Sequence, residues 1–313
     1  MIEMKKKLSP LGHSLKQRLQ SGQNLKFIEA HNGLSCLIAS RAQVSVKDEV
    51  REFDGIWVSS LTTSAARGLP DMEMYLLENR LDTIREIVDS TEKAVLVDGD
   101  TGGEPVAFEY LCQRLERLGV SGIVIEDKRF PKRNSLSEDS NQLLENPIAF
   151  CEKIRRGKDA CSSSEFLIVA RLEGLILGQS IEDTLERAMV YIESGADAIL
   201  VHSRLSEAGQ VFDFAKKYQE NFPIKENRKP LICVPTTYNA TFAEDLFAAG
   251  YSAVIYANHL LRAAHQAMKE VTRSLLLEDR SFESETRCSK VADIFNETGY
   301  TAAIARDKEG LAL

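Results

Sequence analysis

Short runs of apolar residues alternate with longer segments of helical periodicity along most of the chain. The apolar runs predict eight β-strands, at residues 26–30, 55–58, 94–98, 122–126, 166–171, 198–202, 230–234 and 252–256. Amphipathic helices are predicted between them, including residues 72–90, 108–118, 181–194 and 242–249. Strands that alternate with helices in this way predict an α/β fold of the (β/α)8 TIM barrel type, with a doubly wound open sheet as the alternative.

Two similar phrases support a repeated βα unit. Gly195 and Gly250 each stand at the end of a predicted helix and lead directly into a strand, as a helix C-terminal glycine does. No Pro-, Gly- or Ser-rich linker interrupts the chain, so we expect one domain over residues 1–313. Its barrel core spans about residues 24–276, and residues 277–313 form a charged C-terminal helical tail with an amphipathic patch at 291–295.

Composition narrows the functional classes. The 313 residues carry a net charge of −8, which argues against nucleic acid or an anionic membrane surface as partner. No apolar run approaches the ~20 residues of a membrane span. The six cysteines are scattered without a C-x-x-C pair, which is typical of reduced thiols, and we expect a cytoplasmic protein.

Polar and ionisable residues follow nearly every predicted strand. In a (β/α)8 barrel the carboxyl ends of the strands meet at one mouth, where the active site lies. Asp98, Asp100 and Glu126 end two neighbouring strands and form an all-oxygen set that suits Mg²⁺. The alternative for Asp98 and Asp100 is an ordinary turn. Arg171 and His202 carry donors suited to carboxylate or phosphate oxygens, although a strand-end histidine is often only a buried, hydrogen-bonded residue.

The segment after the fourth predicted strand is the most informative part of the chain. Glu126 and Asp127 end an apolar strand, and Lys128, Arg129, Lys132 and Arg133 follow at once. This order suits a site that holds a metal ion and a multiply charged anion together. Residues 128–146 are polar and irregular, which favours a flap that closes over the substrate, while the two arginines are also explained as solvated charge.

These residues resemble a known family. The sequence is similar to the phosphoenolpyruvate mutase family of the isocitrate lyase superfamily, whose hallmark is matched by Glu126, Asp127, Lys128, Lys132, Asn134 and Ser135. Further similar phrases are residues 29–35, 68–71, 98–102, 170–173, 195–203, 234–239 and 256–264, and the resemblance covers about residues 24–296.

The resemblance implies a fold, an assembly and an activity. It implies a (β/α)8 barrel whose last helix is exchanged with a partner subunit in a homodimer or homotetramer. It also implies intramolecular phosphoryl transfer between phosphoenolpyruvate and phosphonopyruvate, the entry step to phosphonates.

The resemblance implies site roles residue by residue. Mg²⁺ would be bound directly by Asp98, with Asp100 and Glu126 acting largely through its waters. Substrate would be held by Trp57, Ser59, Ser60 and Leu61. The catalytic groups would be Asp71, Lys132, Asn134, Ser135, Arg171 and His202.

Two departures and several alternatives remain open at this point. Some family members have Gly where Ser60 stands, and the loop at residues 103–105 also differs. Phosphonopyruvate hydrolase has Thr where Asn134 stands, so Asn134 favours the mutase. A carboxyphosphoenolpyruvate mutase could reuse the same groups. A carbon–carbon lyase is disfavoured because the flap has no cysteine, and a catalytically silent binding barrel is disfavoured because the polar positions are filled.

Overall fold

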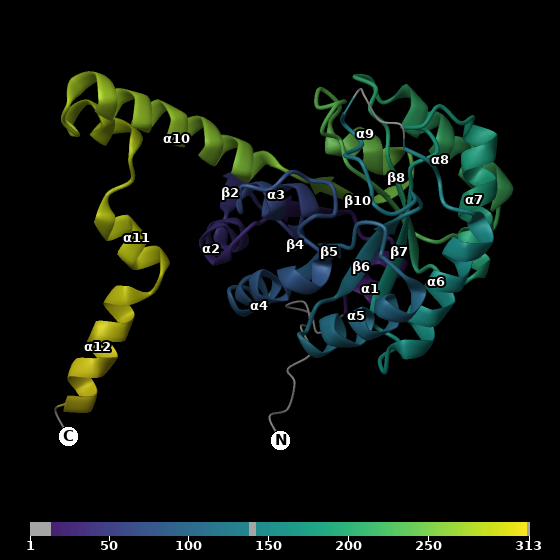
Figure 1. The fold of residues 1–313 in the computed structure, drawn as a ribbon, viewed down its shortest axis with the longest axis horizontal. Coiled ribbons are helices and arrows are strands. Elements are labelled where there is room, and N and C mark those ends of the chain that lie inside the picture. Colours follow the sequence, from purple (N-terminus) through teal and green to yellow (C-terminus); the bar gives the residue numbers. More distant parts are fainter. Residues whose placement is uncertain (1–13, 138–141, 312–313) are drawn as a thin grey trace.

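The computed structural model describes residues 14–137 and 142–311, and in them eight parallel strands close into a barrel (Figure 1). In chain order these are β1 (Leu25–Glu29), β4 (Gly55–Val58), β5 (Ala94–Asp98), β6 (Gly122–Glu126), β7 (Leu167–Leu172), β8 (Ala198–Val201), β9 (Leu231–Cys233) and β10 (Tyr251–Tyr256). Each strand pairs with its neighbour along the chain, and β1 pairs with both β4 and β10. The predicted (β/α)8 barrel is confirmed, and the open-sheet alternative is excluded.

Helices connect the strands. The α-helices are α1 (Leu15–Gln20), α2 (Gly33–Arg41), α3 (Ser60–Ala65), α4 (Leu81–Asp89), α5 (Pro105–Arg117), α6 (Pro147–Ala160), α7 (Ile181–Glu193), α8 (Gly209–Asn221), α9 (Ala243–Ala248), α10 (His259–Glu278), α11 (Val291–Glu297) and α12 (Tyr300–Leu311). Short 3₁₀ helices span Leu77–Arg80, Lys225–Asn227 and Phe282–Arg287. The start of α7 illustrates the local signals, because Ser180 Oγ accepts from the Asp183 N–H and two acidic residues occupy the first turn.

Two local predictions were wrong. The helix predicted at 72–90 begins later, as a 3₁₀ helix at Leu77 and as α4 at Leu81, because the chain turns at residues 71–73, where Glu73 has a φ of +55°. An antiparallel hairpin of β2 (Gln43–Val46) and β3 (Glu49–Glu52) was not predicted. Its two-residue turn, Lys47 and Asp48, has positive φ at both positions, and neither residue is the glycine that usually signals such a turn.

The barrel interior is filled with side chains. Phe27, Trp57, Leu96 and Val124 belong to an inner cluster that α1 closes from below with two leucines. A larger cluster packs the outer faces of the strands against the helices. Gly55 is required for this packing, since a Cβ there would lie 2.2 Å from the Phe27 ring. Because the closed interior is filled, the barrel's own polar pocket lies at the carboxyl ends of the strands.

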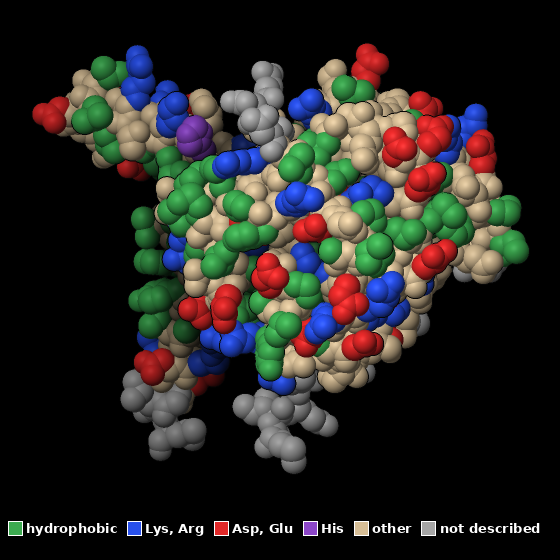
Figure 2. All heavy atoms as spheres, turned by 45° about the vertical axis from the view of Figure 1, so that its right-hand side comes forward, with side chains coloured by type: hydrophobic (Ala, Val, Ile, Leu, Met, Phe, Trp, Pro, Cys, Tyr) green, Lys and Arg blue, Asp and Glu red, His purple; other side chains and the backbone are tan. Residues whose placement is uncertain are grey.

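The C-terminal helices leave the barrel. Helix α10 runs outward from β10 and continues unbroken past residue 276, where the barrel core was predicted to end (Figure 1). Only Ser274 of this helix is buried, and hydrophobic side chains are visible along the projecting tail in Figure 2. The tail returns toward α2, where Arg41 pairs with Glu297 at 2.7 Å. None of the described helices combines the length and apolar composition needed to span a bilayer.

Candidate active site

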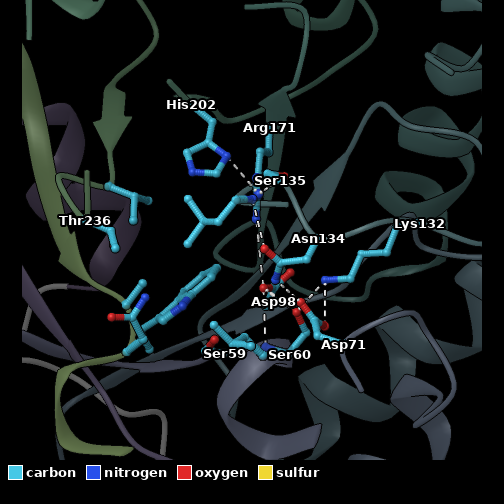
Figure 3. Close-up of a pocket in the computed structure, with 16 residues that line it drawn as sticks. Ser59, Ser60, Asp71, Asp98, Lys132, Asn134, Ser135, Arg171, His202 and Thr236 are labelled. Atoms are coloured by element: carbon cyan, nitrogen blue, oxygen red, sulfur yellow. Dashed lines mark hydrogen bonds and ion pairs between the residues drawn. The ribbon is translucent and has the colours of Figure 1, made fainter. Parts of the chain in front are cut away.

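A polar pocket opens at the carboxyl ends of the strands (Figure 3). Its walls are Trp57, Ser59, Ser60, Leu61, Asp71, Asp98, Lys132, Asn134, Ser135, Leu136, Arg171, His202, Val234, Thr236, Ala257 and Asn258. All the predicted site residues line it except Asp100 and Glu126. The residues come from six strand ends and from two loops, so the barrel topology gathers groups that are far apart in the sequence.

Asp98, at the end of β5, is held at the floor of the pocket. Ser60 donates to Asp98 Oδ2 from its backbone N–H at 3.3 Å and from its hydroxyl at 2.8 Å. Burial by itself raises the pKa of this carboxyl, but the nearby cations Lys132, Arg171 and Arg80 lower it to about 2. Asp98 is therefore ionised at neutral pH and available to a cation.

Lys132 brings a positive charge from the flap into this acidic region. Its Nζ lies 2.7 Å from Ser60 Oγ, 2.7 Å from Asp100 Oδ1 and 3.0 Å from Asp71 Oδ1. Figure 3 shows the side chain pointing toward Asp71 and Asp98. Burial lowers the pKa of this ammonium, yet Asp100 and Asp71 outweigh it and raise the pKa well above its usual value. The flap thus supplies a permanent cation.

Arg171 and His202 form a second wall of the pocket, in which Arg171 carries the positive charge. Arg171 Nη2 lies 2.9 Å from His202 Nδ1 and donates to Ser135 Oγ at 3.0 Å. His202 Nδ1 also lies 2.9 Å from Glu173 Oε1. Because arginine can only donate, Nδ1 either accepts from Arg171 or donates to Glu173, but not both. Burial and then Arg171 lower the pKa of His202, which favours the neutral imidazole.

Glu173 organises this wall and was missed as a site residue. It is fully buried and accepts from Arg171 Nε at 2.6 Å and from Ser135 Oγ at 2.6 Å, while Lys128 Nζ lies 3.1 Å from it. Burial opposes its ionisation, but Arg171 and Lys128 together lower its pKa well below the usual value. Its place two residues after Arg171, on the same side of an extended strand end, was the available sequence signal.

The predicted metal carboxylates do not form a closed cage. Of the residues that the structure describes, no three His, Cys, Asp or Glu side chains lie close enough together to hold a metal ion alone. Asp100 instead pairs with Arg80 at 2.9 Å and with Lys132. Glu126 is buried, its oxygens accept no hydrogen bond from any described residue, and burial raises its pKa to about 7.

These carboxylates still suit a magnesium site. Glu126 Oε1 lies 3.5 Å from Lys128 Nζ and Oε2 lies 3.4 Å from Arg171 Nη2, yet neither oxygen accepts a hydrogen bond from a described residue. The waters around a bound cation would supply the missing donors. Mg²⁺ keeps several waters and takes only one or two protein carboxylates, so it needs no full protein cage. The donor chemistry at Asp98 and Glu126 therefore fits the ion, and the ligand set remains a prediction.

Arg80 was also missed by the sequence analysis. It is fully buried, and its Nη2 donates to the Asp98 carbonyl at 2.6 Å and to Asp100 Oδ2 at 2.9 Å. It braces a tight loop in which Asp100 has a φ of +53° and a Cβ on Gly99 would lie 2.7 Å from Ile123. Arg80 falls within the amphipathic helix predicted at residues 72–90, and no pattern there distinguishes a buried arginine from an exposed one.

The flap predicted at residues 128–146 covers the pocket, although residues 138–141 of it lie outside the described part of the chain. Its base is a short ladder, with the Arg129 N–H bonded to the Leu143 carbonyl at 2.9 Å. Lys132, Asn134 and Ser135 face the pocket, as predicted. Arg133 is exposed, which agrees with its interpretation as solvated charge.

Comparison with known proteins agrees with this geometry. The family model described as phosphoenolpyruvate phosphomutase matches residues 15–276. The phosphoenolpyruvate phosphomutase of Tetrahymena pyriformis is 37% identical over 95% of this chain and 94% of its own length. The crystal structure of the Streptomyces platensis subsp. rosaceus enzyme of the same name has a TM-score of 0.84 and 32% identity, covering 94% of this chain and 98% of that one.

A related hydrolase is nearly as similar. The crystal structure of a phosphonopyruvate hydrolase in complex with oxalate and Mg²⁺ has a TM-score of 0.83 and 30% identity, covering 95% of this chain and 98% of that chain. The two activities thus share one scaffold, and the family model spans nearly the entire barrel of this chain. The chain belongs to the phosphoenolpyruvate phosphomutase family.

Proposed function

We propose that this protein is an isomerase that interconverts phosphoenolpyruvate and phosphonopyruvate by moving the phosphoryl group between the enol oxygen and C3 of one molecule. The single observation that carries the proposal is the flap, in which Lys132, Asn134 and Ser135 all turn into a pocket floored by Asp98. Family membership supports the same reaction class.

The charges of the pocket suit this transfer. Phosphoryl transfer passes through a loose, metaphosphate-like state, so catalysis depends on positioning and on neutralising charge. Arg171 and His202 lie on one side of the pocket and Lys132 on the other, where they can hold the phosphoryl oxygens. Asp71 also faces the pocket. Its negative charge disfavours the approach of any anion other than the bound substrate.

Magnesium completes the charge balance. Asp98 would bind the ion, with Asp100 and Glu126 holding its waters, and the bound ion would neutralise the enolate and phosphoryl oxygens of the substrate. The residues of the chain then have distinct tasks. Ser59, Ser60 and Leu61 bind the carboxylate end, Trp57 forms a wall, and the flap excludes water that would otherwise capture the migrating group.

Phosphonopyruvate hydrolysis is the second candidate function, and one contact bears on the choice. Asn134 donates from Nδ2 to Asp71 Oδ2 at 2.6 Å, so the residue at which the hydrolase is expected to differ directly touches the proposed catalytic carboxylate. The side chain of threonine is shorter than that of asparagine. From the same backbone position, its hydroxyl would not reach Asp71 Oδ2. This contact favours the mutase. A carboxyphosphoenolpyruvate mutase would use the same groups.

Phosphorus NMR separates these possibilities. Purified protein is incubated with phosphonopyruvate and Mg²⁺, and we expect the phosphoenolpyruvate signal to grow. Inorganic phosphate as the main product would identify the protein as a hydrolase. An unchanged spectrum would indicate a catalytically silent binding protein. Addition of EDTA should abolish turnover, and Mg²⁺ should restore it. Turnover that survives EDTA would remove the metal from the proposal.

We also propose a homodimer or homotetramer in which α10 packs on a partner barrel, in the cytoplasm. The outward course of α10 supports the exchange. Leu276 and Leu277 on this helix are 87% and 67% exposed, and an isolated chain would leave both side chains in water. Light scattering coupled to size exclusion gives the mass, and a monomer would contradict the exchange.

All six cysteines are free, which suits the reducing environment of the cytoplasm.

A further inference from the structure

Glu73 joins three segments of the active site at one buried carboxylate. Its Oε2 accepts the backbone N–H of Lys132 at 2.7 Å. Its Oε1 accepts the Thr101 N–H at 2.9 Å and the Thr101 hydroxyl at 2.7 Å. One side chain therefore links the loop after α3, the loop that carries Asp100, and the flap. Glu73 does not line the active-site pocket, so it does not contact substrate there.

The chemistry of these contacts requires a carboxylate. Three donors share the two oxygens, one oxygen facing the flap and the other facing Thr101. A glutamine side chain has one carbonyl oxygen, and its NH₂ group would face a donor on one of the two sides. The backbone is also unusual, because Glu73 has a φ of +55°, where non-glycine residues are uncommon. The surrounding contacts hold the residue in this conformation.

Apolar packing does little to hold the flap closed. Phe130, Leu136 and Leu143 are 57%, 38% and 59% exposed, although all three belong to the flap. Closure therefore depends on polar contacts. Those at Lys132 Nζ, Asn134 and Ser135 are made by side chains that face the pocket and are available to substrate. The bond from the Lys132 peptide to Glu73 is made by the backbone instead, so it does not depend on what the Lys132 side chain binds in the pocket.

We propose that Glu73 is the latch of the flap, a positioning residue that fixes the Lys132 peptide over the pocket and so controls how often water reaches the migrating phosphoryl group. This role rests on the proposed mutase function, because only a transfer that must exclude water needs the flap to stay shut. When the latch is weakened, the P–O bond of phosphoenolpyruvate or the P–C bond of phosphonopyruvate still breaks. The phosphoryl group is then captured by water, which gives inorganic phosphate and pyruvate, with the proton from water ending on C3.

The experiment compares Glu73→Gln and Glu73→Gly with the wild type. Glycine suits the positive φ, so this second variant removes the carboxylate without backbone strain. Glu78→Gln is the matched control, because Glu78 lies five residues away with its side chain 69% exposed and pairs with Arg114 instead of the flap. Hydrogen exchange of residues 128–137 is measured with Mg²⁺ and oxalate, and phosphorus NMR gives the share of product released as phosphate.

We expect both Glu73 variants to raise flap exchange by about tenfold or more, as loss of a charge-assisted hydrogen bond allows. The phosphate share should rise with it, while exchange in the barrel strands and the control stay at wild-type values. Unchanged flap exchange and an unchanged phosphate share would overturn the proposal. Faster exchange throughout the barrel in both variants would also overturn it, since Glu73 would then be a general stabilising residue. If the wild type makes no phosphoenolpyruvate, the proposed function fails, but flap exchange still tests the latch.

Discussion

Asn134 and Asp71 are joined by a hydrogen bond of 2.6 Å from Nδ2 to Oδ2, which ties the flap to the loop after α3 across the mouth of the pocket. The other oxygen of Asp71 lies 3.0 Å from Lys132 Nζ. One carboxylate thus receives two side chains from the flap. The residues that close the pocket to water thus also hold the proposed catalytic carboxylate.

Replacement of Asn134 should change the fate of the phosphoryl group. In Asn134→Thr the hydrogen bond to Asp71 is lost, and we expect phosphoenolpyruvate formation to fall by about 10- to 100-fold, the effect of one hydrogen bond to a charged group. The fraction released as phosphate should increase. Phosphorus NMR measures both products. Asn221→Thr, at an exposed position at the end of α8, is the control. Wild-type product ratios in Asn134→Thr would show that Asn134 does not select the mutase.

Lys132 should be essential for turnover. The variant Lys132→Met removes a buried cation that contacts Asp71, Asp100 and Ser60. We expect kcat to fall by about 100- to 1000-fold, because a preorganised positive group near the phosphoryl oxygens is lost. Arg133→Met, at the next and exposed position, should retain wild-type kcat. Circular dichroism checks that the barrel persists. Activity within a few-fold of wild type would remove Lys132 from the catalytic groups.

Arg80 should matter for stability and for metal affinity. In Arg80→Met the Asp98 carbonyl and the Asp100 carboxylate lose a buried donor. Removing one partner of a buried ion pair costs about 3–5 kcal/mol, so the free energy of unfolding in urea should fall by that amount. The Mg²⁺ concentration needed for half-maximal activity should rise. Arg85→Met, which removes a side chain that is 58% exposed, should leave both quantities nearly unchanged. Equal effects of the two variants would refute the bracing role.

His202 should make stability depend on pH. Burial and Arg171 lower its pKa from 6.5, so the unfolded chain takes up a proton at a higher pH than the folded protein does. The contribution to stability is complete above about pH 6.5, the unfolded value, and is lost as the pH falls from there through the lowered pKa. Urea unfolding at pH 7.5 and 5.5 should show a larger loss for the wild type than for His202→Gln, by up to about 1.4 kcal/mol per pH unit. Identical losses would mean that His202 titrates normally.

The barrel and the strand-end residues of the pocket could be predicted from the sequence because their signals are local. The roles of Asp71, Lys132, Asn134 and Ser135 were implied by the family resemblance. The strands β4 to β8 matter most here, and the bounds of β4, β5 and β6 were predicted as observed. Their apolar runs are continuous because both faces are buried, and polar residues follow at the ends. Since the carboxyl ends of parallel strands lie at the same end of the barrel, the sequence alone assigns Asp98, Arg171 and His202 to one mouth.

Glu73 and Arg80 could not be assigned from sequence, and Glu173 was missed although it stands two residues after Arg171 at a strand end. The tertiary structure shows which groups each of them contacts. The sequence around a charged residue in a helix or loop is the same whether its side chain faces water or a buried carboxylate. Arg80 is buried only because it reaches the β5 loop, and Glu73 only because the flap folds onto it. The sequence thus determined the strands and the residues at their ends, through periodicity and burial. Which ionisable groups pair with one another was decided by packing between segments distant in the chain, and no local pattern encodes that.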